Sequence, residues 1–222
     1  MEIDPDSLPV DRRYALMIGA IVPRPIAVVG TCDALGRPNL APFSFFTGFG
    51  SEPMGLVVSV ANPPGGAGEK DTLRNAKPGS EGGTGAFTVS VATESNIAQV
   101  VACAEALAHG ESEFELSGLT PIAGHRVRAP RPAESPVTFE CVTQQVVRMA
   151  PGVPGASNLL IGRVVLVHVR DDLVDARLRI DPVRLAAVGR MGGIEYCSTH
   201  ERAAIPSGRE ALGHGVRWSR DG

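Results

Sequence analysis

Short runs of β-branched and apolar residues, separated by turn residues, recur along most of this chain. In the run that begins at residue 137, Val137, Phe139 and Cys141 occupy alternate positions with polar residues between them, which predicts a strand with one buried face. Asp33 and Gly36 suit a hairpin turn between the first two runs. The predicted strands are residues 26–31, 40–43, 55–60, 87–92, 137–147 and 159–170.

Helical spacing of apolar residues is clear in one segment only. Residues 97–108 repeat apolar side chains at this spacing, and Thr93 or Ser95 can cap the helix that they predict. A shorter helix is predicted at residues 72–76, ended by Pro78 and the glycines that follow. Because strands and helices do not alternate regularly, we expect a mainly β fold, an antiparallel barrel with minor α content.

The length and composition fit one compact unit. The chain has 222 residues, of which 43% are hydrophobic, so we expect a single domain over residues 1–222. The polar tail at about 198–222 is either an arm across a partner or disordered. With 21 basic and 24 acidic residues well mixed, the chain has no electrostatic footprint for nucleic acid or an anionic membrane.

Several other classes of protein are disfavoured by the sequence. The opening residues MEIDPD are acidic and interrupted by proline, unlike a signal peptide, and the longest apolar runs are too short to span a bilayer, so a cytoplasmic protein is expected. The four cysteines and five histidines lack metal-binding spacings, which predicts free thiols and no metal.

His168 lies in a valine-rich strand, where we expect it to be a polar residue on the barrel face. The glycines at 65–68 lack the residues that a phosphate loop needs around Lys70.

The segment 39–60 carries the candidate chemistry. It places four phenylalanines, small residues and hydroxyls shortly before the cation Lys70. A flavin mononucleotide (FMN) needs an apolar slot for its ring and a cluster of donors for its phosphate. Pro42 lacks an amide donor, so this stretch is not expected to form a central strand, and Gly48 and Gly50 would allow a nest of backbone amides. The residue types leave a second interpretation open, since clustered aromatics are more often ordinary core.

Ordered sequence blocks resemble a known family. The segments PRPIAVVGT at 23–31, NLAPFSFF at 39–46 and KDTLRN at 70–75 resemble the flavin reductase-like family of FMN-binding split barrels, of the nitrilotriacetate monooxygenase component B type. Similar later blocks follow in the same order, SPVTFEC at 135–141, IGRVV at 161–165 and RMGGIEY at 190–196. The resemblance covers about residues 12–197.

This resemblance implies an FMN-binding split β-barrel with flanking helices that assembles as a homodimer. It places the flavin along residues 41–46 and its phosphate at Ser59, Lys70 and Thr72. Arg24 reaches the phosphate or the subunit contact, or forms a surface ion pair. From its position at the start of the short helix, Asp71 caps that helix, contacts the site, or does both. NADH or NADPH would supply a hydride, and electrons would pass to free flavin, oxygen or a partner monooxygenase. The expected cofactor-binding residues are Arg24, Ala41, Pro42, Phe43, Ser44, Phe45, Phe46, Ser59, Lys70, Asp71 and Thr72.

One departure from the family pattern leaves two functions open. Many flavin reductases of the family carry a Gly-Asp-His segment before the strand predicted at 159–170, whereas this chain has Gly-Ala-Ser-Asn at 155–158. The sequence therefore predicts an NAD(P)H-dependent flavin reductase or, as the alternative, an FMN-binding electron carrier that turns over no pyridine nucleotide. A barrel with no cofactor is a third interpretation, and it predicts a melting temperature that added FMN does not move.

Overall fold

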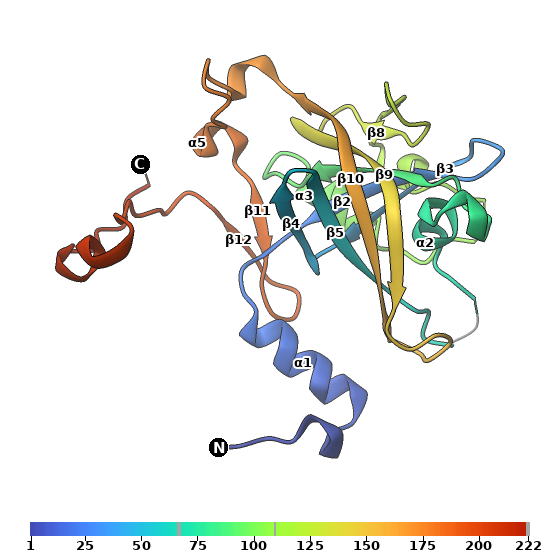
Figure 1. The fold of residues 1–222 in the computed structure, drawn as a ribbon, viewed down its shortest axis with the longest axis horizontal. Coiled ribbons are helices and arrows are strands. Elements are labelled where there is room, and N and C mark those ends of the chain that lie inside the picture. Colours follow the sequence, from blue (N-terminus) through green and yellow to red (C-terminus); the bar gives the residue numbers. More distant parts are fainter. Residues whose placement is uncertain (66–67, 109, 221–222) are drawn as a thin grey trace.

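The computed structural model describes residues 1–65, 68–108 and 110–220, and its main feature is one curled antiparallel sheet (Figure 1). The strand order is β3-β2-β6-β9-β10-β5-β4. Strands β3 and β4 end opposite edges of this order, although only Ser44 and Phe45 separate them along the chain, so the sheet wraps around on itself. The strands are β2 (Ala27–Cys32), β3 (Pro38–Phe43), β4 (Phe46–Ser51), β5 (Met54–Ala61), β6 (Ala86–Val91), β9 (Val137–Arg148) and β10 (Ser157–Val169).

Smaller elements flank the barrel. A three-stranded sheet joins β1 (Arg24–Pro25), β11 (Val188–Arg190) and β12 (Tyr196–Ser198), and β7 (Pro121–Ile122) pairs with β8 (Arg131–Pro132). The α-helices are α1 (Val10–Ala20), α2 (Asp71–Ala76), α3 (Ile97–Ala102), α4 (Glu113–Ser117) and α5 (Pro182–Leu185). Single 3-10 turns lie at η1 (Pro5–Ser7), η2 (Gly79–Glu81), η3 (Asp171–Leu173) and η4 (Gly208–Gly213).

Strand β2 is buried along its whole length because both of its faces are covered. Successive side chains of a strand point to opposite faces, so Ala27 and Val29 enter one apolar cluster and Val28 enters another. The first cluster includes Phe87 and Leu160 from β6 and β10, and the second lies against α3 and α4. This double cover explains why residues 26–29 are apolar without alternation.

The predicted strands and the mainly β fold class are confirmed. The six predicted runs correspond to β2, β3, β5, β6, β9 and β10, and β3 is an edge strand, as Pro42 predicted. The first hairpin turns at the predicted position. The carboxylate of Asp33 accepts hydrogen bonds from the amides of Leu35 and Arg37, both at 2.9 Å. Gly36 has a φ of +85° there, a conformation that favours glycine.

Two local predictions were wrong, and one helix was missed. The helix predicted at 97–108 ends at Ala102, because the amides of Ala104 and Glu105 bond three residues back and tighten the chain into a turn, and Asn96 is its N-cap. The segment with Gly48 and Gly50 is strand β4 and its hairpin rather than an anion nest. Helix α1 was not predicted. None of its residues is buried, although Val10, Tyr14, Met17 and Ile18 recur at helical spacing and were a signal for it.

The carboxylate of Glu140, on β9, fastens a loop to the outside of the sheet. Glu140 is fully buried and accepts the amides of His125, Arg126 and Val127 at 2.6–3.0 Å. It also contacts Nε2 of His168 at 2.6 Å, which confirms His168 as a polar residue of the barrel face. Burial pushes the pKa of Glu140 upward, but the hydrogen bonds from His168 and the three amides outweigh it, so its pKa lies below the ordinary value.

The cysteines are not joined by disulfides, and three of the four are buried. Burial raises the pKa of the Cys141 thiol to about 12, so this thiol is inert at neutral pH. Within residues 1–65, 68–108 and 110–220, no group of three or more His, Cys, Asp or Glu side chains is arranged to hold a metal ion. No helix in the same ranges has both the length and the apolar character needed to cross a membrane.

The C-terminal segment beyond β12 extends away from the barrel, shown in red in Figure 1. Its described part, up to residue 220, folds back once where Arg202 and Ser219 exchange backbone hydrogen bonds at 2.9 and 3.0 Å. The side chains of Leu212 and Trp218 are 91% and 69% exposed.

Candidate functional site

Two adjoining cavities open beside the corner between β3 and β4. The arginine cavity has a volume of about 360 Å³, and the lysine cavity has a volume of about 410 Å³. Both are lined by Pro42, Phe43 and Ala104, so they adjoin, and we call the two together the groove. The other principal residues of the arginine cavity are Tyr14, Ile18, Arg24, Ile26, Ser44, Val100, Val101, Arg190 and Tyr196, and those of the lysine cavity are Asn39, Ala41, Pro63, Glu69, Lys70, Asp71, Thr72, Arg74, Cys103 and Glu113.

The shared wall is rigid because its residues also belong to the barrel. Pro42 pairs with Val28 across the β2–β3 hairpin, and the partly buried Phe43 packs on the first apolar cluster. The corner is tied to β5 by a hydrogen bond of 2.8 Å from the amide of Ser59 to the carbonyl of Phe45. A wall fixed in this way keeps its shape when a ligand binds.

The lysine cavity has one cation that the chain leaves without a partner. Among the described residues, the ammonium of Lys70 has no ion pair or hydrogen bond, whereas the neighbouring Glu69 pairs with Lys77 at 2.7 Å and with Arg148 at 3.2 Å. Asp71 is bonded to Arg74. Since the acidic neighbours are already paired with cations, the charge of Lys70 remains available to a ligand.

A hydroxyl and an amide lie beside this lysine at the start of α2. The hydroxyl of the buried Thr72 accepts a hydrogen bond of 3.3 Å from Nδ2 of Asn39. Its own proton is free to point into the cavity, because the hydroxyl rotates to suit its surroundings. Lys70 and Thr72 therefore offer a charged donor and a neutral donor at the same end of the groove.

Glu113 is a buried acid on the other side of the lysine cavity. Its side chain accepts the amide of Leu40 at 2.9 Å, which satisfies a backbone donor of the edge strand β3. Burial raises the pKa of Glu113, and the hydrogen bond from Leu40 offsets this effect only in part. The neutral acid is therefore favoured more than for an exposed glutamate, which limits repulsion of an anionic ligand.

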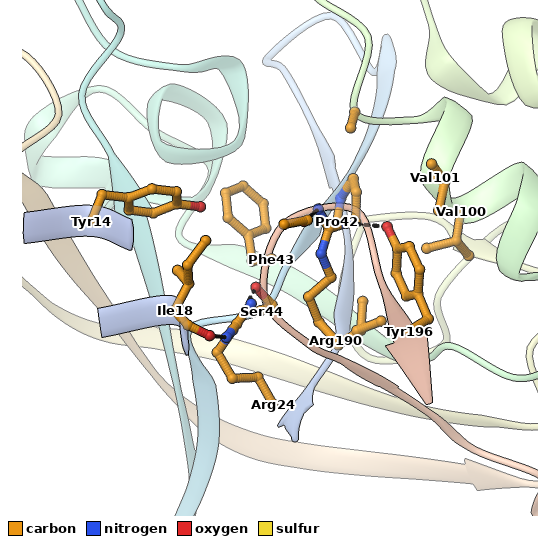
Figure 2. Close-up of a pocket in the computed structure, with 13 residues that line it drawn as sticks. Tyr14, Ile18, Arg24, Pro42, Phe43, Ser44, Val100, Val101, Arg190 and Tyr196 are labelled. Carbon is orange, nitrogen blue, oxygen red and sulfur yellow. Dashed lines mark hydrogen bonds between the residues drawn. The ribbon is translucent and has the colours of Figure 1, made fainter. Parts of the chain in front are cut away.

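Arg24 lies on the floor of the arginine cavity and is only 3% exposed. Its Nη1 donates to the carbonyls of Ile18 and Ile21 at 2.6 and 2.8 Å, and its Nη2 donates to that of Met191 at 2.8 Å. Its Nε lies 3.3 Å from the hydroxyl of Ser44, as Figure 2 shows. Arg24 thus joins the end of α1, the β3–β4 corner and the β11–β12 hairpin.

A second guanidinium, that of Arg190, lies against Tyr196 in the same cavity (Figure 2). Its Nη1 donates to the Tyr196 hydroxyl, and its Nη2 donates to the carbonyl of Gly193 at 2.7 Å. The guanidinium carbon is 4.5 Å from the centre of the Tyr196 ring, which is cation–π distance. Both contacts hold the side chain of Arg190 at the cavity without neutralising its charge.

The structure brings most of the predicted site residues to the groove, but it divides them between its two ends. Ala41, Lys70, Asp71 and Thr72 line the lysine cavity, Arg24 and Ser44 line the arginine cavity, and Pro42 and Phe43 line both. Arg24 is therefore not at the end of the groove where Lys70 lies.

Three predicted residues line neither cavity. Phe45 lies 5.7 Å from the Arg24 guanidinium and 6.3 Å from the ring of Tyr14, Phe46 packs on the core, and Ser59 bonds through its hydroxyl to Ser157.

Sequence reasoning missed several residues of the groove. Asn39, Arg190 and Tyr196 line the groove and lie inside sequence blocks that resemble the family. Their place in these blocks could have indicated them as site residues. Tyr14 lies on α1, which was not predicted, although the spacing of Val10, Tyr14 and Ile18 was a signal for that helix. Glu113 gave no signal, since its contact with Leu40 joins residues far apart in the sequence.

The polar side chains of segment 155–158, which departs from the expected Gly-Asp-His pattern, are hydrogen-bonded within the fold. Besides the Ser157 contact with Ser59, Nδ2 of the buried Asn158 donates to Asn62 at 2.7 Å and to the carbonyl of Val60 at 2.9 Å. Asn62 in turn donates to the carbonyl of Val153 at 2.9 Å. These side chains fasten the loop after β9 and do not line the groove.

Comparison with known proteins agrees with this geometry. Residues 18–184 match the family described as flavin reductase like domain. An uncharacterised protein of Halalkalibacterium halodurans is 41% identical over 197 residues, covering 88% of this chain and 91% of that protein. The crystal structure of nitrilotriacetate monooxygenase component B from Bacillus cereus has a TM-score of 0.84 at 34% identity, covering 92% of this chain and 98% of that one.

A more distant structure shows how far the fold extends. The flavoredoxin of Desulfovibrio vulgaris is 22% identical, with a TM-score of 0.68 over 87% of this chain and 94% of that one, and it shares the fold. These matches support a flavin-linked oxidoreductase and confirm the predicted resemblance. The family match spans residues 18–184, and a relative with 41% sequence identity aligns with 88% of the chain. The protein therefore belongs to the flavin reductase-like domain family.

Proposed function

We propose that this protein binds FMN in the groove and acts as a flavin oxidoreductase that takes electrons from NADH or NADPH. The observation that carries the proposal is the juxtaposition of Lys70 and Thr72 with the apolar wall of Pro42 and Phe43 in one cavity of about 410 Å³. Such a cavity has the size of ordinary cofactor sites, which is about 300–1,000 Å³. A bound FMN would supply a hydride acceptor, which none of the side chains provides.

The phosphate end of the proposed site is Lys70 with Thr72. An unpaired ammonium beside a hydroxyl favours a dianion, because charge-assisted hydrogen bonds are about twice as strong as neutral ones. Asp71 is bonded to Arg74 and does not compete for Lys70. Ser59 is engaged with Ser157, outside this end of the groove, so the proposed phosphate site does not depend on it.

The ring end of the proposed site is the wall from Ala41 to Phe43. These side chains offer apolar contact and exclude water from one face of a flat heterocycle. Arg24 contacts the neighbouring Ser44 and places a buried positive charge close to the same corner. A positive charge near the ring favours the anion that forms when the ring accepts a hydride. The chain's part in the reaction is thus to orient the reactants and to supply this charge.

We also propose a cytoplasmic homodimer that can pass electrons to free flavin, oxygen or a partner monooxygenase. Exposed apolar side chains on α1 support a contact with a second copy, since Val10, Leu16 and Met17 are 44–64% exposed. The similarity to a protein named as component B of a monooxygenase supports a partner enzyme.

A second candidate function is electron transfer without pyridine-nucleotide turnover. The segment 155–158 favours it, because Ser157 and Asn158 stand where relatives carry a histidine and both are bonded within the fold. In that case the bound flavin would be reduced by a partner reductase.

Anaerobic titration tests the proposal and separates the two candidates. The purified protein is loaded with FMN, and its visible absorbance is followed while NADH or NADPH is added without oxygen. We expect bleaching by at least one nucleotide. Bleaching by a partner reductase alone selects the electron carrier, and a protein that neither retains FMN nor gains melting temperature from it contradicts both candidates.

A further inference from the structure

We propose that the arginine cavity is a second binding site, for a small planar organic carboxylate. This inference goes beyond flavin binding, which we assign to the lysine cavity, and it does not depend on that assignment. It rests on three features of the cavity, which are its charge, the geometry of Arg190 and the composition of its walls.

The charge of the arginine cavity is not balanced by the chain. Among the described residues, no aspartate or glutamate lines it, although two guanidiniums do. Arg24 donates only to carbonyls and a hydroxyl, and Arg190 donates to one carbonyl and one phenol. Cations withdrawn from water normally lie against anions, because neutral partners do not offset the lost hydration. A bound anion would complete the cavity.

The two guanidiniums differ in what they can do for that anion. Arg24 uses all three of its nitrogens on the chain, so it contributes charge and holds the floor in place. Arg190 uses one N–H on Tyr196 and one on Gly193, which leaves its remaining donors for a ligand. A planar guanidinium matches the two oxygens of a carboxylate. We therefore assign carboxylate recognition to Arg190.

The walls of the cavity favour a flat conjugated body behind that carboxylate. The rings of Tyr14, Phe43 and Tyr196 line it together with Val100 and other aliphatic side chains (Figure 2). Aromatic side chains contact flat ligands over a large apolar area. The cavity volume of about 360 Å³ is near the lower end of the usual range, which suits a single-ring compound rather than a whole dinucleotide.

The lysine cavity provides an internal comparison for this argument. Glu69, Asp71, Glu105 and Glu113 are among its lining residues, so its carboxylates outnumber its cations, Lys70 and Arg74. The described lining residues of the arginine cavity include no carboxylate. Of the two cavities, the arginine cavity is therefore the one that selects for a small carboxylate.

Calorimetric titration with benzoate, and with benzamide as its uncharged counterpart, tests the inference. We expect one saturable benzoate site per chain and at least tenfold weaker binding of benzamide. Arg190→Gln should weaken benzoate binding at least tenfold. Arg190→Lys should weaken it less, because lysine keeps the positive charge and loses only the paired N–H donors of the planar guanidinium. Arg163→Gln, which removes an exposed arginine of β10 that lines neither cavity, is the matched control and should leave binding unchanged.

The result that overturns the inference is equal binding of benzoate and benzamide, no saturable benzoate site, or equal losses in Arg190→Gln and Arg163→Gln. Displacement of benzoate by NADH at matching affinity would also overturn it, since the site would then belong to the nucleotide. Far-ultraviolet circular dichroism of each variant shows whether the fold is intact. The FMN content is measured separately by absorbance, so loss of flavin binding with benzoate binding retained contradicts only the proposed function.

Discussion

Two regions of this molecule treat their charged side chains in opposite ways. At Glu140 the carboxylate accepts three backbone amides and contacts His168, so the chain itself satisfies it. In the groove, Lys70 has no partner among the described residues and Arg190 has only neutral ones. The first arrangement stabilises the fold, and the second retains binding capacity for something outside the chain.

The comparison teaches that burial of charge does not by itself indicate a functional site. Glu140 is more deeply buried than any charged residue of the groove, yet its hydrogen bonds are complete. What distinguishes the groove is that Lys70, Arg24 and Arg190 line its cavities and have no anionic partner among the described residues. If this distinction is correct, changes at Glu140 should alter stability alone, and changes at Lys70 should alter ligand affinity alone.

The largest expected effect is on stability, in the Glu140→Gln variant. Replacing the carboxylate by an amide turns one acceptor into a donor that faces backbone amides, which we expect to cost about 3 kcal/mol of unfolding free energy. Urea denaturation measures this loss. Glu134→Gln is the matched control, since the exposed Glu134 accepts only the amide of Thr120 and should cost less than about 1 kcal/mol. A loss at Glu140 no larger than at Glu134 would contradict the assigned role.

The same carboxylate should make stability depend on pH. The pKa of Glu140 lies below its ordinary value of 4.5, so the folded state binds its proton less readily than the unfolded chain does. Its contribution is therefore complete above the ordinary pKa and is lost as the pH falls through the lower, folded-state pKa. Melting temperatures from pH 7 down to acid should fall more steeply in the wild type than in Glu140→Gln. Parallel curves for the two proteins would show that another group controls acid unfolding.

Lys70→Ala should affect the ligand and not the fold. We expect FMN to bind about 10- to 30-fold more weakly, equivalent to about 1.5–2 kcal/mol, because one charge-assisted contact to the phosphate is lost. Fluorescence titration of FMN measures the change, and raising the ionic strength should weaken the wild type more than the variant. Lys77→Ala is the matched control, because Lys77 pairs with Glu69 and does not line the cavity. Equal losses in the two variants would argue against a phosphate site at Lys70.

The smallest expected effect is that of Glu113→Gln. The glutamine oxygen can still accept the amide of Leu40, and the raised pKa of Glu113 means that its charged form is disfavoured in the folded state. We expect the stability at pH 7 to change by less than about 1 kcal/mol, with FMN affinity unchanged or slightly higher. Urea denaturation and FMN titration of this variant beside Glu140→Gln measure the contrast. A loss as large as that at Glu140 would remove the difference drawn here between the two acids.

The sequence by itself determined the features that depend on neighbouring residues. Alternation around Phe139 identified β9, Asp33 and Gly36 identified the first hairpin, and the missing amide of Pro42 identified an edge strand, because each is a property of a short stretch of chain. The ordered blocks, including Lys70 with Thr72, indicated the family and the cation of the groove.

Only the tertiary structure decided which of these side chains meet. Arg24 bonds the carbonyl of Met191 and Glu113 bonds the amide of Leu40, and these contacts join segments that no local pattern connects. The same holds for Ser59, whose contact with Ser157 takes its hydroxyl away from the groove. The physical reason is that a local pattern fixes which face of an element is apolar, whereas the curling of the sheet and the packing of distant segments fix which polar groups are satisfied and which face a cavity.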